Sequence, residues 1–335
     1  MASQKRKSPG VTELCKGILS GNRSVLARAI TLAESTRTDD RKKIAQVLRK
    51  LLPSTGNSIR IGITGVPGVG KSTFIEVFGE LLAREGRQIA VLTIDPTSQK
   101  TKGSILGDKT RMERLSRNPS VFIRPSPTGL ALGGVTYHTR EAILLCEAAG
   151  FNTILIETVG VGQSETIVRG MVDFFLLFML TGAGDELQGI KKGIMEMADG
   201  IVITKADGQN KKAASQAKAD ALQALHFHSP SRSGWKPKVH TVSSIENTGL
   251  VDVWKMIQAF HQHGKTEGYF SQNRKDQQTH WLDEILESDF REVLGSPQVA
   301  KKKQQLLNQI LSKGILPTDA ALELWKVVIK RGGRK

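Results

Sequence analysis

The sequence has few cysteines, few aromatic residues and no long apolar run. Only two of its 335 residues are cysteines, Cys15 and Cys146, and aromatic residues make up 5%. Its longest apolar run, from Phe174 to Leu180, is far shorter than the roughly 20 residues that span a bilayer. The cysteines have no metal-ligand spacing and lie in apolar helical patterns, so we expect both to be reduced and structural. The N-terminal residues lack the apolar stretch of a secretory signal. These absences predict a cytoplasmic protein without a membrane partner.

Acidic residues are also scarce relative to basic ones. The chain has 48 Lys and Arg against 32 Asp and Glu, and residues 1–56 alone hold twelve basic residues against four acidic ones. Nucleic-acid binding uses such charge, but the sequence shows neither a basic stripe interleaved with aromatic residues nor a reading-helix motif. We therefore interpret the excess as a solvated basic surface and expect no nucleic-acid partner. An alternative, membrane targeting through the basic N-terminus, predicts salt-sensitive binding to liposomes.

A glycine-rich loop between an apolar strand pattern and a helical pattern is the central motif. The segment GVPGVGKST matches the phosphate loop G-x-x-x-x-G-K-[ST] in its proper strand–loop–helix context. The glycines let backbone N–H groups turn toward a phosphate, and the helix N-terminus adds partial positive charge. Lys71 is expected to reach the β- and γ-phosphates, and the Ser72 hydroxyl to bind Mg²⁺. The predicted nucleotide contacts are Gly65, Val66, Pro67, Gly68, Val69, Gly70, Lys71, Ser72 and Thr73.

Acidic residues follow two further strand patterns, where parallel sheets bind their ligands. Asp95 ends the strand pattern that begins at Ile89, and we interpret it as a Mg²⁺ or water contact in preference to a turn residue. Glu157 ends another strand, three residues before Gly160, whose N–H can meet a γ-phosphate. Asp108 is expected to help orient the attacking water. The catalytic candidates are Lys71, Asp95, Asp108 and Glu157, and the metal candidates are Ser72, Asp95, Asp108 and Glu157.

A guanine-recognition motif follows the next strand patterns. Thr204-Lys205-Ala206-Asp207 matches N/T-K-x-D, in which the aspartate accepts hydrogen bonds from N1–H and the 2-amino group of guanine. Adenine offers neither donor, so GTP and GDP are the predicted nucleotides. After the last strand pattern, Ser243, Ser244 and Ile245 are placed to offer a backbone N–H to the guanine O6. The order of these motifs is typical of a GTPase and not of an ATP-using kinase.

The strand and helix patterns predict an α/β fold: a P-loop NTPase with a mostly parallel central sheet and flanking helices. We expect an N-terminal helical extension (1–56), a GTPase domain (57–262) and a C-terminal helical arm (263–335). The helices of the arm are too short to bury their apolar faces alone, so we expect them to dock on the core or on a second copy. Within the predicted GTPase domain, the glycine-rich block from Gly182 to Gly193 suggests a moving element.

Four segments, GVPGVGKST, ILGDKTRM, ETVGVGQSE and GDELQGIKKGIMEMADGIVITKADG, resemble the ArgK/MeaB family, the G-protein chaperones of adenosylcobalamin-dependent acyl-CoA mutases. The resemblance covers roughly residues 11–330. It implies a homodimer joined by the C-terminal helices, and a partner that is methylmalonyl-CoA mutase or a relative. It also implies that GTP hydrolysis gates cofactor loading and protection, with Asp185 to Lys192 as the switch. Thr204 departs from the commoner asparagine of the guanine motif.

A second hypothesis is a GTP-dependent metal-insertion protein of the nickel type. The histidine pairs His226/His228 and His261/His263 have i,i+2 spacing, but they form no long tract and have no cysteine companion. Stoichiometric Ni²⁺ or Zn²⁺ on the purified protein would favour it.

Overall fold

The computed structural model describes residues 9–94, 112–125, 132–158, 164–181, 192–226 and 233–332. The chain forms two compact units that divide between Gln277 and Gln278. No helix in these described ranges has the length and apolarity needed to cross a membrane. The predicted division of the chain at residues 56 and 262 stays a prediction.

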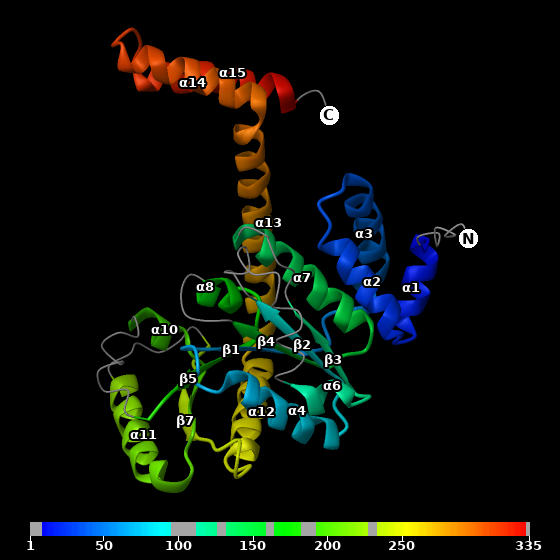
Figure 1. The fold of residues 1–335 in the computed structure, drawn as a ribbon, viewed down its shortest axis with the longest axis vertical. Coiled ribbons are helices and arrows are strands. Elements are labelled where there is room, and N and C mark those ends of the chain that lie inside the picture. Colours follow the sequence, from blue (N-terminus) through cyan, green and yellow to red (C-terminus); the bar gives the residue numbers. More distant parts are fainter. Residues whose placement is uncertain are drawn as a thin grey trace, which may run out of the picture. The chain divides into compact units, whose positions relative to one another are not determined.

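A parallel sheet of seven strands, counted over the described residues, forms the centre of the larger unit (Figure 1). The strand order is β3-β2-β4-β1-β5-β6-β7, and every neighbouring pair is parallel. The predicted α/β P-loop fold is thereby confirmed, with a sheet that is parallel throughout its described strands. The strands are β1 (Ile59–Gly65), β2 (Ile89–Ile94), β3 (Val121–Arg124), β4 (Thr153–Thr158), β5 (Phe174–Met179), β6 (Gly200–Ile203) and β7 (Lys238–Thr241).

Helices cover both faces of this sheet, because successive side chains of each strand point to opposite sides. In β4, Ile154 and Ile156 join the apolar cluster beneath α7, whereas Leu155 joins the cluster beneath α4 and α12. Apolar residues of β5, β6 and β7 form a third cluster with α10 and α11. The helices of these layers are α4 (Lys71–Arg84), α6 (Glu113–Arg117), α7 (Leu132–Ala148), α8 (Ser164–Arg169), α10 (Lys192–Met197), α11 (Lys211–His226) and α12 (Leu250–Thr266), with a short 3-10 helix η2 (Gly208–Asn210).

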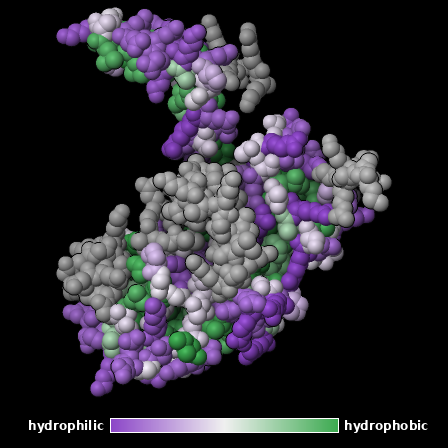
Figure 2. Space-filling view, viewed as in Figure 1, coloured by the Kyte–Doolittle hydropathy of each residue, from purple (hydrophilic) through white to green (hydrophobic). Residues whose placement is uncertain are grey.

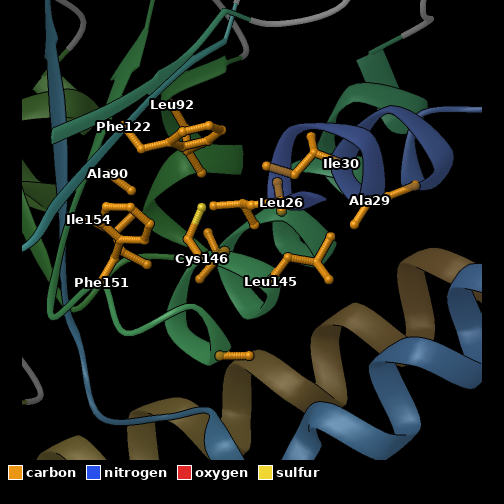
Figure 3. Packing of buried hydrophobic residues seen from close by; sticks show 14 of the residues in the cluster. Leu26, Ala29, Ile30, Ala90, Leu92, Phe122, Leu145, Cys146, Phe151 and Ile154 are labelled. Atoms are coloured by element: carbon orange, nitrogen blue, oxygen red, sulfur yellow. The ribbon is translucent and has the colours of Figure 1, made fainter. Parts of the chain in front are cut away.

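The N-terminal extension is a helical bundle packed on α7. It comprises α1 (Val11–Leu19), α2 (Arg23–Ala33), α3 (Thr38–Leu51) and a 3-10 turn, η1 (Leu52–Ser54). Figure 3 shows Leu26 and Ile30 of α2 on the same side of Cys146 as Leu145, with Leu92 and Phe122 of the sheet on the other. Both cysteines of the chain are free and buried, and burial raises the pKa of Cys146. They are packing residues, as the sequence predicts.

Helix α13 (Tyr269–Gly295) begins in the larger unit and continues into the C-terminal one. Its Arg274 donates to Asp173 before β5 (2.9 Å) and to the Ser58 carbonyl before β1 (2.6 Å). A Cβ on Gly264 of α12 would overlap the Phe270 ring, so α12 and α13 meet closely at their turn. In the C-terminal unit, α14 (Pro297–Leu311) and α15 (Pro317–Gly332) follow, as the helical patterns predict.

Candidate functional site

The phosphate-loop residues connect β1 directly to α4 at the carboxyl edge of the sheet. Gly65 has φ +149° beside the Phe178 carbonyl, and a Cβ there would lie 2.6 Å from that oxygen. Gly70, with φ +100°, is the N-cap residue of α4. Between them lie Val66, Pro67, Gly68 and Val69, and Lys71, Ser72 and Thr73 begin the helix. Since the first N–H groups of a helix have no partner within it, this loop presents donors suited to an anion.

The side chain of Lys71 is folded back onto this loop. Its Nζ donates to the Gly65 carbonyl (2.6 Å) and to the Val66 carbonyl (3.2 Å), and the residue is 6% exposed. Desolvation by burial lowers the pKa of Lys71, while the charges of Glu157 and Glu165 raise it. The ammonium group is thus held where water is scarce, with neutral carbonyl groups as its direct partners. A phosphate oxygen would be a stronger partner than either carbonyl.

Ser72 and Glu157 meet although 85 residues separate them. The Ser72 Oγ donates to Glu157 Oε1 at 2.8 Å. Glu157 lies near the end of β4, where its backbone is in register with Ile63 of β1 and Thr93 of β2. It is buried, at 4% exposure, so its carboxylate is directed into the molecule beside the phosphate loop. A hydroxyl and a carboxylate at this spacing are hard oxygen ligands of the kind that Mg²⁺ prefers.

Thr204 links the phosphate loop to the guanine motif. Its Oγ1 donates to the Val69 carbonyl at 2.7 Å and also lies 3.3 Å from the Met179 carbonyl. The threonine that departs from the commoner asparagine therefore reaches the phosphate loop with its hydroxyl. Lys205 follows with φ +55° and an exposed side chain, and this left-handed residue turns the chain toward Asp207.

The carboxylate of Asp207 is held by the segment after β7. Ser243 Oγ donates to Asp207 Oδ2 at 2.7 Å, and Ser243 is fully buried. The backbone N–H of Ala206 donates to the Val242 carbonyl at 3.1 Å, which joins the two segments again. Sequence reasoning assigned Ser243 a backbone role and missed this side-chain contact, since its register against Asp207 depends on the pairing of β6 with β7.

Ser244 and Ile245 lie in the turn after Ser243, and Ile245 is exposed. The turn is closed by Glu246, which pairs with Lys211 at 2.9 Å and accepts from the Gly208 N–H at 3.4 Å. The hydrogen bond from Lys211, followed by that from Gly208, lowers the pKa of Glu246. Gly249 allows the return to α12, since a Cβ there would overlap the Thr241 carbonyl oxygen. The turn is therefore shaped before any nucleotide contacts it.

Three predicted site residues, Asp95, Asp108 and Gly160, lie outside the described residues. A further carboxylate that sequence reasoning missed is that of Glu165, which is buried in α8 and whose charge acts on Lys71. Its only signal in the sequence is its position eight residues after Glu157, in the same motif.

Two histidines of the metal-insertion hypothesis, His261 and His263, have packing contacts, and His228 lies outside the described residues. The His263 ring nitrogen Nε2 lies 2.8 Å from the Ser233 carbonyl, and the His261 ring meets Phe270 edge to face at 4.8 Å. Among the described residues, no group of three histidine, cysteine, aspartate or glutamate side chains is arranged to hold a metal ion.

This chain is similar over most of its length to known GTPases. A family model described as "Methylmalonyl Co-A mutase-associated GTPase MeaB" matches residues 26–298. GTPase ArgK of Escherichia coli (strain K12) is 45% identical over 279 residues, 83% of this chain and 84% of that protein. A Mus musculus protein named methylmalonic aciduria type A homolog, mitochondrial, is 41% identical over 332 residues, 96% of this chain and 80% of that protein. The crystal structure of an LAO/AO transport system kinase has a TM-score of 0.77 at 34% identity, covering 98% of this chain and 99% of that one.

Proposed function

The chain belongs to the MeaB family of methylmalonyl-CoA mutase-associated GTPases, and on that premise we propose that it serves an adenosylcobalamin-dependent acyl-CoA mutase such as methylmalonyl-CoA mutase. It is a GTPase. In the proposed function, GTP hydrolysis gates the loading of the mutase with its cofactor and the protection of the loaded enzyme. The observation that carries this proposal is the family match over residues 26–298, which includes the phosphate loop, Glu157 and Asp207.

In the proposed site, the bound nucleotide replaces hydrogen-bond partners that the protein supplies when no nucleotide is bound. Lys71 leaves the carbonyls of Gly65 and Val66 for the β- and γ-phosphates. Asp207, oriented by Ser243, accepts from N1–H and the 2-amino group of guanine. Because Thr204 joins the phosphate loop to the guanine motif, the two halves of the nucleotide are positioned by one hydrogen-bonded unit.

A Mg²⁺ ion fits the chemistry of the donors beside the phosphate loop. Ser72 and Glu157 supply a hydroxyl and a carboxylate that already contact each other at 2.8 Å, and we propose that both hold the ion, with Asp95 and Asp108 as further candidates. When bound, Mg²⁺ neutralises charge that develops on the transferred phosphoryl group. The protein's own groups hold the phosphates in place, and Asp108 is the residue proposed to orient the attacking water.

A pull-down tests the proposed partner. The chain, bound to GTP, GDP or a non-hydrolysable GTP analogue, is expected to retain the mutase from a lysate of the same organism in amounts that depend on the nucleotide. The retained protein is identified by mass spectrometry, and a bead-coupled chain without nucleotide is the control. If no mutase is retained with any nucleotide, the chaperone function is wrong and the GTPase activity stands alone.

We also propose that the arm forms a homodimer. Helix α13 carries Leu282, Leu286 and Phe290 at helical spacing, and all three are exposed. Further exposed apolar residues lie on α14 and α15, and Figure 2 shows apolar surface among the hydrophilic side chains of this C-terminal unit. Contiguous apolar surface on a folded protein commonly marks a protein interface. In a homodimer, the exposed apolar residues of one arm would pack against the same residues of the second copy.

A Leu286→Asp variant is expected to be a monomer where the wild type is a dimer. Leu286 is 58% exposed in the single chain, so the aspartate should not disturb the fold but would place a charge inside the interface. Light scattering after gel filtration measures the mass. Ser288→Asp, two residues further along the helix and also exposed, adds the same charge on another side and is the matched control. A dimer that survives Leu286→Asp would exclude this surface.

A further inference from the structure

A cavity lies between α10, the carboxyl end of α11 and residues 234–237. Its volume is about 390 Å³. Cavities that bind small organic groups span about 300–1,000 Å³, so this one has room for a large apolar side chain. It opens at the amino end of β6, whereas Thr204 and Asp207 follow the carboxyl end of the same strand. It is therefore separate from the nucleotide site.

The floor of the cavity is held by an ion pair and hydrogen bonds. Asp199 is buried there, pairs with Arg169 at 3.0 Å and accepts from the Phe175 N–H at 2.8 Å. The Trp235 indole N–H donates to the Asp199 carbonyl at 2.9 Å, and its ring meets Phe260 edge to face at 5.4 Å. Because these groups are already fixed, an incoming side chain would order little of the protein, which keeps the entropic cost of binding low.

The lining of the cavity includes a group of apolar residues that can adapt in shape. Met195 and Met197 come from α10, Leu222 and Leu225 from α11, and Trp235 from the segment before β7. Methionine side chains adjust their shape to a partner, and tryptophan is enriched where interfaces concentrate their binding energy. Leu222 remains 42% exposed at this cavity. This group of residues suits an apolar side chain.

Among the described residues, three lysines lie in or near the lining of this cavity, against one acidic lining residue outside the Arg169–Asp199 pair, Glu196. Lys236 contributes to the lining, and Lys238 lies over the Trp235 ring at 5.1 Å. Lys218 lies one helical turn before Leu222 on α11. Burial lowers the pKa of His240 on β7, and the charges of Lys218 and Lys238 lower it further against the opposing charge of Asp252. The positive field favours an occupant flanked by acidic residues.

One wall of the cavity belongs to α10. Its residues Met195 and Met197 follow the glycine-rich block from Gly182 to Gly193, of which residues 182–191 lie outside the described residues. The floor continues from Asp199 into β6, which ends beside the guanine motif. A partner bound here would contact both elements at once, so its affinity would depend on how α10 lies against α11.

We infer that this cavity receives an apolar side chain from an acidic segment of the mutase, an inference that rests on the proposed function. The apolar residues of the lining hold the side chain, and the lysines pair with its acidic flanks. The cavity is thereby an interaction site on the GTPase unit that is distinct from the nucleotide pocket.

Two single substitutions on α11 test this inference. Leu222→Glu places a negative charge at the mouth of the cavity, whereas Gln223→Glu adds the same charge to a neighbouring exposed position outside it. Affinity for the purified mutase, measured by biolayer interferometry with the GTP analogue bound, should fall about tenfold or more for Leu222→Glu. It should change no more than about twofold for Gln223→Glu. Both variants should keep the wild-type affinity for GTP, which reports an intact fold.

A second pair of variants tests the contribution of the basic residues to mutase binding. Lys236→Glu, at the cavity, should weaken mutase binding and flatten its dependence on salt, whereas Lys255→Glu on α12 should do neither. Equal effects of cavity and control variants would overturn the inference. So would a change in the oligomeric state of Leu222→Glu alone, because the cavity would then belong to a contact between copies. If the wild-type chain binds no mutase at all, the proposed function fails and the inference falls with it.

Discussion

An Asp207→Asn variant should bind GTP more weakly than the wild type and xanthosine triphosphate more tightly. Guanine offers two donors, N1–H and the 2-amino group, to the carboxylate, and an amide can accept only one of them well. Xanthine carries a carbonyl where guanine carries the amino group, so the amide N–H of the variant finds an acceptor there. The loss of a charged acceptor facing two donors should weaken GTP binding by about 10³-fold. Titration with fluorescent analogues of both nucleotides measures the two affinities.

The surroundings of Asp207 make this result specific. Ser243 Oγ donates to Asp207 Oδ2 at 2.7 Å and can equally donate to an amide oxygen, so the substituted side chain should keep its place. Asp220→Asn is the matched control, because Asp220 lies on the surface of α11 and accepts from Gln216 at 2.8 Å, one turn away. GTP affinity that stays within a few-fold of wild type in Asp207→Asn would show that this aspartate does not recognise the base.

The central strands of this fold are predictable because the sheet is parallel and covered on both faces. Such strands read as continuous apolar runs, and Phe174–Met179 of β5 is fully buried as its sequence suggests. The loops at their carboxyl ends carry motifs with a physical meaning at fixed spacing, so Lys71 and Asp207 could be predicted as nucleotide contacts before any coordinates. Their roles stay predictions, whereas the strands and the fold class are confirmed.

Contacts between distant segments were not predictable from local pattern. The hydroxyl of Thr204 reaches the Val69 carbonyl across 135 residues, a contact that neither motif indicates. The motifs grouped Ser72 with Glu157 as metal candidates, but their direct hydrogen bond follows from β4 lying beside β1. Register sets these distances, and register depends on how the whole sheet packs.

The start of α13 is a second example. The apolar pattern indicates a helix only around Trp281 to Leu294, yet the helix begins at Tyr269. Its first turns are held by Phe270 against α12 and by Arg274 with Asp173, and these isolated contacts form no hydrophobic period.

A Lys71→Ala variant should fold as well as the wild type and fail to bind GTP productively. Lys71 is 6% exposed, and burial lowers its pKa. Keeping this charge out of water should therefore destabilise the nucleotide-free protein. Removing the charge should leave the unfolding midpoint without nucleotide unchanged or higher. With GTP, the wild type should be the more stable of the two proteins, because the variant lacks the cation that faces the β- and γ-phosphates. Hydrolysis should fall about 10²–10³-fold, the usual loss for one missing donor to a developing negative charge.

Thermal unfolding with and without GTP separates these two effects in one experiment. At a GTP concentration about 100 times its Kd, the wild type should gain about 2.7 kcal/mol of stability. Lys71→Ala should gain almost none at the same concentration. Arg84→Ala, at the far end of the same helix, removes a cation that lies away from the loop and should keep the full gain. A variant that is less stable than wild type without nucleotide would mean that Lys71 holds the loop together through the Gly65 and Val66 carbonyls, and that its main role is structural.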